Sequence, residues 1–115
     1  MWICTKFGFY SIVDAASKEG HLLVRARRPG DIERIFPDAA VKETLGRDYR
    51  YRAELPRVDV AQRFFELLME HDAHNFKASV RDKQLHDVYL SAWSVFGRLQ
   101  PGGPYGDDDR QSRLF

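Results

Sequence analysis

Residues 2–13 are dense in aromatic and β-branched side chains, a composition typical of a β-strand. Strand alternation would place one set of side chains on the core face: Ile3, Thr5, Phe7, Phe9, Ser11 and Val13. The opposite face would then carry Trp2, Cys4, Lys6, Gly8, Tyr10 and Ile12. Because both faces hold apolar groups, the pattern predicts a central strand whose second side still needs cover.

A second alternating segment, residues 21–27, predicts the partner strand of an antiparallel hairpin. Its apolar side chains would face the core and its arginines would face outward: Leu22, Val24 and Ala26 against Arg25 and Arg27. The sequence Arg-Pro-Gly-Asp then ends this strand. We expect Asp31 to cap a short helix over residues 32–36.

Two further strands and two helical regions follow. Residues 40–45 predict a weak strand, and residues 49–55 a clear one in which Tyr, Tyr, Ala and Leu alternate with Arg50, Arg52 and Glu54. A helix is expected over residues 58–71 with Asp59 as its N-cap. Apolar periodicity continues over residues 76–99 after a capping Asn75, and the pattern leaves open whether this region is one helix or two.

The predicted order of elements is therefore ββαββαα, and the predicted fold class is α+β. The economical architecture is a four-stranded antiparallel sheet with the helices packed on one face. We expect residues 1–99 to be a single domain. Residues 100–115 have no periodicity and predict a flexible C-terminal tail.

Composition and charge narrow the class of protein. The 115 residues carry a net charge of only +1, so bulk charge alone favours neither nucleic acid nor membranes as partner. Cys4 is the only cysteine, which excludes an intrachain disulfide and a thiolate metal cluster. The start lacks the basic segment of a signal peptide, and no apolar run approaches the roughly 20 residues of a membrane span. These features predict a cytoplasmic protein without a membrane partner.

The outward face of the predicted sheet is the strongest candidate for a binding surface. It would combine aromatic and basic side chains: Trp2, Lys6, Tyr10, Arg25, Arg27, Arg50 and Arg52. Such a mixture suits single-stranded nucleic acid, because bases stack on rings while guanidinium groups hold phosphates. The plain alternative is a solvated face on which the arginines pair with Glu43 and Glu54.

Two other candidates are weaker. The group His71, Asp72 and His74, with His86 and Asp87 further on, contains residue types that ligate metals, although the plainer interpretation is a helix end with its capping acids. Cys4 within a strand is more typical of a small buried hydrophobe than of a nucleophile. The sequence therefore predicts no catalytic residues and no cofactor.

Four motifs together resemble a family of small bacterial and phage-borne proteins whose activity is uncharacterised. They are the Met-Trp…Thr-x-x-Gly-Phe-Tyr-Ser start, Val24-Arg25-Ala26-Arg27 with a following Asp31, Asp48-Tyr49-Arg50-Tyr51-Arg52, and Asn75-Phe76-Lys77 with His86, Tyr89 and Trp93. The resemblance covers about residues 1–99 and points to shared positions: Arg25, Arg27, Tyr49, Arg52, Asn75 and His86. It also implies a modulator of a host complex, including an anti-CRISPR-type inhibitor, since such families often travel on mobile elements.

The sequence thus favours a small non-enzymatic protein that binds a macromolecule, either a protein complex or a nucleic acid. One alternative from another class is a small metal- or His-dependent hydrolase. The other is a structural homodimer that buries the aromatic outer face of the first strand.

Overall fold

The structure is a computed structural model, and it describes residues 1–102. The chain divides into two compact units, residues 1–74 and the residues from Asn75 onward, and each is described here by itself. The single domain predicted over residues 1–99 stays a prediction. The predicted flexible tail lies, from residue 103 onward, outside the described residues.

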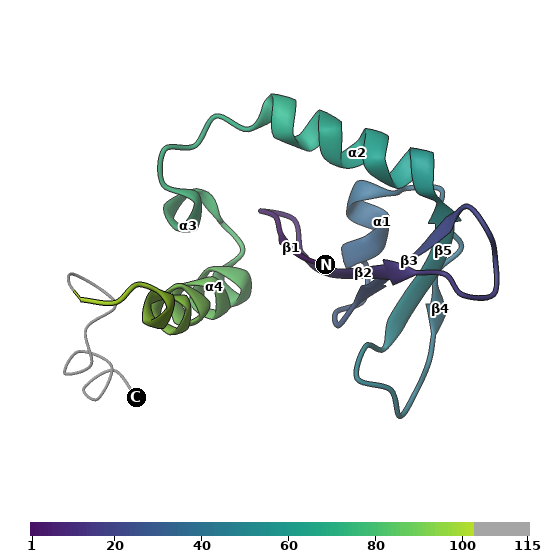
Figure 1. The fold of residues 1–115 in the computed structure, drawn as a ribbon, viewed down its shortest axis with the longest axis horizontal. Coiled ribbons are helices and arrows are strands. Elements are labelled where there is room, and N and C mark those ends of the chain that lie inside the picture. Colours follow the sequence, from purple (N-terminus) through teal and green to yellow (C-terminus); the bar gives the residue numbers. More distant parts are fainter. Residues whose placement is uncertain (103–115) are drawn as a thin grey trace. The chain divides into compact units, whose positions relative to one another are not determined.

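The first unit is an antiparallel sheet with two helices (Figure 1). Its elements are β1 (Trp2–Cys4), β2 (Phe9–Asp14), β3 (His21–Ala26), α1 (Asp31–Ile35), β4 (Lys42–Glu43), β5 (Tyr51–Pro56) and α2 (Arg57–Glu70). The sheet order is β1-β2-β3-β5-β4, and each neighbouring pair is antiparallel. The α+β class and the antiparallel sheet are confirmed, but the predicted count of four strands is wrong, because this sheet has five.

The extra strand arises because the first stretch is a hairpin and not one strand. Thr5 closes the turn: its hydroxyl oxygen accepts hydrogen bonds from the backbone N–H groups of Phe7 and Gly8, both at 3.1 Å. The Thr5 N–H in turn donates to the Gly8 carbonyl oxygen at 2.9 Å. This local network reverses the chain within four residues, which uniform strand propensity along residues 2–13 does not reveal.

The hairpin also changes which side chains face the core. Trp2 pairs with Ser11 and Cys4 with Phe9, so even positions in β1 share a face with odd positions in β2. Tyr10 and Ile12 consequently lie in the core, whereas Val13 is exposed. The predicted assignment of residues 9–13 to faces was therefore wrong: Tyr10, expected on the outer surface, is fully buried.

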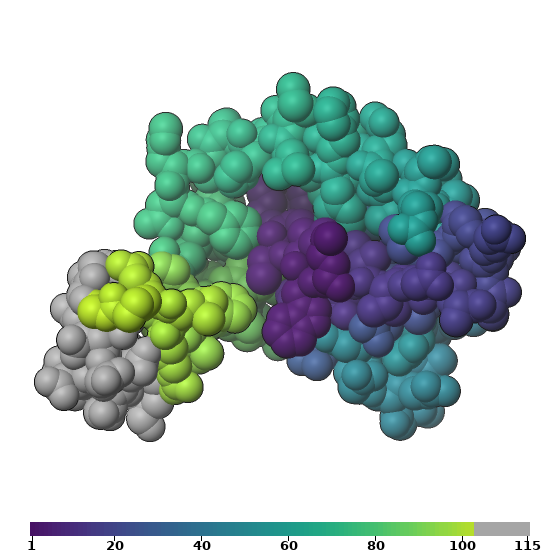
Figure 2. All heavy atoms as spheres, viewed as in Figure 1, coloured from purple at the N-terminus to yellow at the C-terminus, as the bar shows by residue number. Residues whose placement is uncertain are grey.

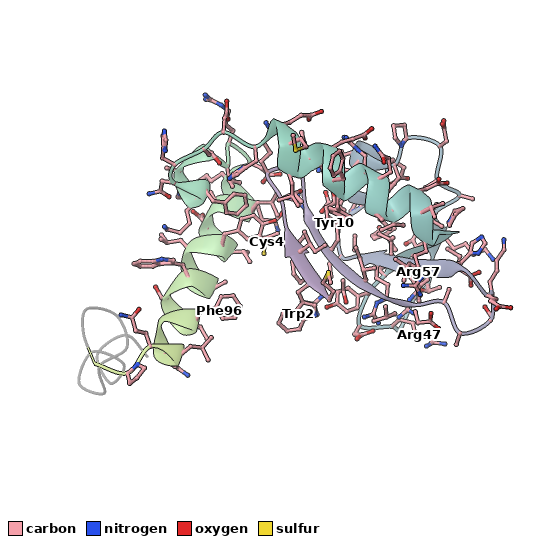
Figure 3. All side chains as sticks on the ribbon, turned by 45° about the horizontal axis from the view of Figure 1, so that its top comes forward. Trp2, Cys4, Tyr10, Arg47, Arg57 and Phe96 are labelled. Carbon is pink, nitrogen blue, oxygen red and sulfur yellow. The ribbon has the colours of Figure 1, made fainter. Side chains whose placement is uncertain are left out.

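Helices α1 and α2 cover one face of the sheet. The core contains Tyr10, Ile12, Val24, Ala26 and Ala53 from the strands, Ile32, Ile35 and Phe36 from the α1 region, and Val60 from α2, with Phe64 and Leu67 packed against it. Figure 3 shows Tyr10 beneath α2, and the Tyr10 and Phe64 rings meet edge to face with centroids 6.3 Å apart. The opposite face of the sheet is not covered by a helix of this unit.

Asp31 is a buried carboxylate at the start of α1, and it does not cap that helix as predicted. The N-cap is Gly30, whose φ of 86° is a left-handed conformation that suits glycine. The Asp31 carboxylate accepts from Arg28 Nε at 2.9 Å and from Arg34 Nη1 at 2.5 Å, so two guanidinium groups compensate its burial. The Tyr10 hydroxyl donates to the Asp31 carbonyl oxygen at 2.7 Å.

Gly8 fits against this buried group, and we expect Gly8→Ala to destabilise the protein. An added Cβ would lie 2.9 Å from Tyr10 Oη and 3.0 Å from Asp31 Cγ, and both of these residues are buried. Overpacking of this kind costs about 1–3 kcal/mol, measurable by urea unfolding. Gly46→Ala is the comparison, since its Cβ meets nothing within 4 Å and only the φ of 79° strains it. A Gly8→Ala protein no less stable than Gly46→Ala would contradict the packing described here.

The second unit is helical in its described part. It contains α3 (Phe76–Ser79), α4 (Lys83–Phe96) and a short 3₁₀ turn, η1 (Gly97–Leu99), so the region is two helices and not one. Side chains cap both helices: Asn75 accepts from the Ala78 N–H, as predicted, and Asp82 accepts from the Leu85 N–H. The Phe76 and Tyr89 rings stack with centroids 5.6 Å apart.

Candidate functional site

The face of the sheet opposite α1 and α2, called the uncovered face below because no helix of the first unit packs on it, carries a row of side chains that crosses all five strands. The backbone registers place Trp2 opposite Ser11, Ser11 opposite Arg25, Arg25 opposite Arg52 and Arg52 opposite Lys42. We call these five residues the outer row. In the space-filling view, the N-terminal residues at one end of the row lie at the surface of the unit, coloured purple (Figure 2).

An aromatic ring holds the arginines of β3 in place. Tyr49, just before β5, is buried, and its ring centroid lies 4.5 Å from the guanidinium carbon of Arg25 and 4.6 Å from that of Arg27. Arg25 also donates from Nη2 to Ser11 Oγ at 2.6 Å, and Arg52 donates from Nε to the Tyr49 carbonyl oxygen at 3.2 Å. Two guanidinium groups thereby contact one ring, an arrangement that cation–π attraction stabilises, and a third is held by the backbone of the same residue.

The positive charge of this cluster is only partly compensated. Arg52 meets Asp48 at 3.4 Å, and the Asp48 side chain is 67% exposed, so this pair is weak. Within residues 1–102, no carboxylate forms an ion pair with Arg25 or Arg27, and the Arg25 Nε is buried without a hydrogen-bond partner. The buried Nε is out of reach of a ligand, but the other N–H donors of Arg25 and Arg27 suit an anion, which would supply the missing counter-charge.

The structure brings together some of the predicted contact residues and separates others. Trp2, Arg25 and Arg52 lie in the outer row, and Arg27 joins them at Tyr49. Arg50 instead pairs with Glu43 at 2.7 Å, as the plain alternative predicted for that residue. Lys6 lies in the β1–β2 turn with its ammonium group 5.3 Å from the Phe7 ring centroid. Tyr10 is in the core on the other side of the sheet, where Figure 3 places it away from Trp2.

Three residues of this surface are missing from the sequence-based set of contacts: Ser11, Lys42 and Tyr49. Only the strand register shows that Ser11 and Lys42 belong to the row. Tyr49 was marked only as a position that the resemblance shares. Four of those six shared positions, Arg25, Arg27, Tyr49 and Arg52, meet in this cluster.

Cys4 lies on the same face, and its chemistry does not fit a nucleophile. Partial desolvation raises the pKa of the Cys4 thiol, so less of it is thiolate at any given pH. We expect Cys4 to react with a disulfide reagent at pH 8 more slowly than glutathione does, and the rate to keep rising as the pH is increased further. A rate above that of glutathione at pH 7 would contradict this environment.

The histidine and aspartate candidates do not form a metal site in the described part of the chain, where no group of three potential ligands comes together. His71 and His74 belong to the first unit and His86 to the second. His86 lies 3.4 Å from Asp87, which also accepts from Lys83 at 3.0 Å, and these two partners lower the pKa of Asp87. The pair resembles ordinary ion pairing on an exposed helix surface.

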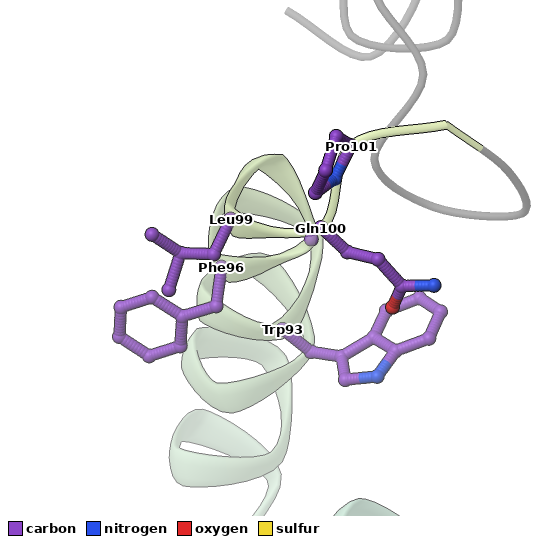
Figure 4. A pocket seen from close by; sticks show the side chains of 6 residues that line it. Trp93, Phe96, Leu99, Gln100 and Pro101 are labelled. Carbon is purple, nitrogen blue, oxygen red and sulfur yellow. The ribbon is translucent and has the colours of Figure 1, made fainter.

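The end of α4 forms a shallow hollow that Figure 4 shows from close by. It is lined by Trp93, Phe96, Gly97, Leu99, Gln100 and Pro101. The polar side-chain groups of these six residues are the Gln100 amide and the Trp93 indole N–H. No helix among the described residues is both long and apolar enough to cross a membrane.

Comparison with known proteins adds no identification: no family model matches the chain, and no curated protein and no solved structure matches it.

Proposed function

We propose that this protein is a small non-enzymatic binding protein that uses the outer face of its sheet to bind single-stranded nucleic acid. The observation that carries the proposal is the outer row, in which an exposed tryptophan and three cations occupy register-paired positions on an uncovered sheet. Trp2 is 67% exposed, so a base has access to its ring. The arginines supply donors for phosphate oxygens.

A single strand fits this surface better than a duplex does. Bases are available for stacking only when they are unpaired, and the aromatic group of the row is useful only for such bases. The Tyr49 ring contributes indirectly, because the arginines already occupy its surroundings. Recognition would consequently rest on phosphates with one stacked base, which favours affinity over sequence specificity.

The proposal is tested by fluorescence anisotropy with a labelled 12-nucleotide single strand and the matching duplex. We expect saturable binding of the single strand and weaker binding of the duplex. The logarithm of the binding constant should fall linearly with the logarithm of the salt concentration. Lys18→Gln is the matched control, since it removes one exposed positive charge from the β2–β3 turn, away from the row. Equal loss of affinity in Lys18→Gln and Arg52→Gln would show bulk charge, not the outer row, to be responsible.

The other hypotheses remain predictions. An acidic protein partner would use the same cations but not the stacking ring. A homodimer would bury Met1 and Trp2, which are 78% and 67% exposed, and light scattering at micromolar concentration distinguishes it from a monomer. The implied modulator role on a mobile element is compatible with nucleic-acid binding, and it rests on the resemblance alone.

A further inference from the structure

The length of the outer row sets the size of ligand that it can take. Neighbouring strands lie about 4.8 Å apart, so the four steps from Trp2 to Lys42 span roughly 19 Å. Single-strand sites on small β-folds begin at about four nucleotides. The row has the length of such a minimal site and no more, because β1 and β4 are the two edges of the sheet.

The two ends of the row differ in chemistry. Trp2 lies at the β1 edge, where its ring and the Phe9 ring meet edge to face with centroids 6.0 Å apart, and the residue is still 67% exposed. Arg25, Arg52 and Lys42 occupy the other part. Ser11 lies between them, almost wholly buried, and contributes by holding Arg25. A bound strand would therefore meet a stacking platform first and then three cations.

The two arginines of the row are held before any ligand arrives. Arg25 is fixed by Ser11 and by the Tyr49 ring, and the Arg52 side chain, 18% exposed, is fixed by the Tyr49 carbonyl oxygen. Each guanidinium group has five N–H donors, and these contacts use only part of them. Fixed donors lose little conformational entropy on binding, which raises affinity for a ligand of matching spacing.

We infer that the outer row binds about four nucleotides of a single strand that run across the β-strands, with one base stacked on Trp2 and phosphates at Arg25, Arg52 and Lys42. Tyr49 acts as a positioning residue that holds the arginines and does not itself stack on a base. This inference rests on the proposed function and adds to it the site size, the direction of the strand and a separate role for each end of the row.

A series of oligothymidylates of two, four, eight and twelve nucleotides tests the site size. We expect affinity to rise steeply from two to four nucleotides. Beyond four, it should rise only by the statistical factor that comes from the number of four-nucleotide registers in a longer strand. An affinity that keeps rising steeply up to twelve nucleotides would overturn the inference but leave the proposed function intact. If the 12-mer does not bind at all, the proposed function itself fails. Oligouridylates of the same lengths show whether DNA and RNA are treated alike.

Two variants test the roles of the two ends. Trp2→Ala is expected to lower affinity for the tetramer about tenfold with an unchanged salt slope, since it removes stacking and no charge. Lys42→Gln is expected to reduce the salt slope by about 0.7, the value for one phosphate on a single strand. A substitution that only disturbed the structure would not change the affinity in one variant and the salt slope in the other. If both variants change the same quantity, or neither differs from Lys18→Gln, the inference is wrong.

A spectroscopic signal provides an independent reading of the stacked base. The chain has two tryptophans, and Trp93→Phe leaves Trp2 as the sole indole reporter. We expect the tetramer to quench the remaining fluorescence as it binds, with the same midpoint as the anisotropy titration. Binding without quenching would place the strand elsewhere than on Trp2. An acidic peptide that competes as well as the tetramer would favour a protein partner instead.

Discussion

Arg25→Glu is expected to weaken binding of a single-stranded oligonucleotide at least about 100-fold. Hydrogen bonds to charged groups contribute about 1.5–3 kcal/mol, and each 1.4 kcal/mol is tenfold in affinity. Arg25 lies in the middle of the outer row, opposite Arg52, so a carboxylate there would both remove a phosphate contact and attract the neighbouring guanidinium groups away from the ligand. Anisotropy titration at fixed salt measures the change.

Two controls accompany this variant. Lys18→Glu makes the same charge reversal at an exposed turn outside the row, and we expect it to weaken binding less than fivefold. Because Arg25 also contacts Ser11 and Tyr49, circular dichroism and urea unfolding must show that Arg25→Glu remains folded. If it does not, Arg25→Gln keeps a polar side chain in place and still removes the charge. Unchanged binding by a folded Arg25 variant would exclude the outer row as the site.

Tyr10→Ala is expected to lower the free energy of unfolding by about 3–5 kcal/mol, the usual cost of truncating a large buried aromatic side chain. The Tyr10 ring is fully buried against Phe64, and its hydroxyl donates to the Asp31 carbonyl oxygen. Tyr10→Phe isolates that hydrogen bond and should cost about 1–2 kcal/mol. Burial raises the pKa of Tyr10, so the hydroxyl keeps its proton and its donor role throughout the physiological range.

Trp2→Ala is the matched comparison on the opposite face of the same hairpin. We expect it to change stability by less than about 1 kcal/mol, because the Trp2 side chain is mostly exposed. The two substitutions should therefore affect different quantities. Tyr10→Phe is expected to lower stability and leave oligonucleotide affinity unchanged. Trp2→Ala is expected to lower oligonucleotide affinity and leave stability nearly unchanged. If Tyr10→Phe is fully folded and still binds the oligonucleotide more weakly, Tyr10 must contribute to the binding surface.

The alternation of apolar and polar residues predicted the face of the sheet correctly for Arg25 and wrongly for Tyr10. The face of Arg25 follows from Val24 and Ala26, whose small and β-branched side chains lie in the core as expected. Residues 2–13 gave no comparable guide, because both candidate faces are apolar and either choice buries similar surface. A turn closed by Thr5 decides the register, and one shift of register moves every side chain to the other face.

The ranges of the helices were predicted more closely than their capping residues. Asn75 caps α3 as its short side chain predicts. The caps predicted for the two other helices were wrong. Gly30 takes the left-handed N-cap position of α1, and the Asp31 carboxylate is instead held by Arg28 and Arg34. The N-cap of α2 is Pro56 and not Asp59, and no side chain caps that helix. The candidate site was only partly predictable for the same reason: its arginines stand out in the sequence, but Lys42 and Ser11 join them only through tertiary pairing.

A titration of isotope-labelled protein with a single-stranded tetranucleotide, followed by amide and indole NMR chemical shifts, tests the central claim most directly. Binding on the uncovered face of the sheet predicts shifts that are largest for Trp2, Ser11, Arg25, Arg52 and Lys42 and small for the amides of α2, which cover the other face. Shifts concentrated on α2 or α4, or no shifts at a saturating tetranucleotide concentration, would contradict the claim that this face binds single-stranded nucleic acid.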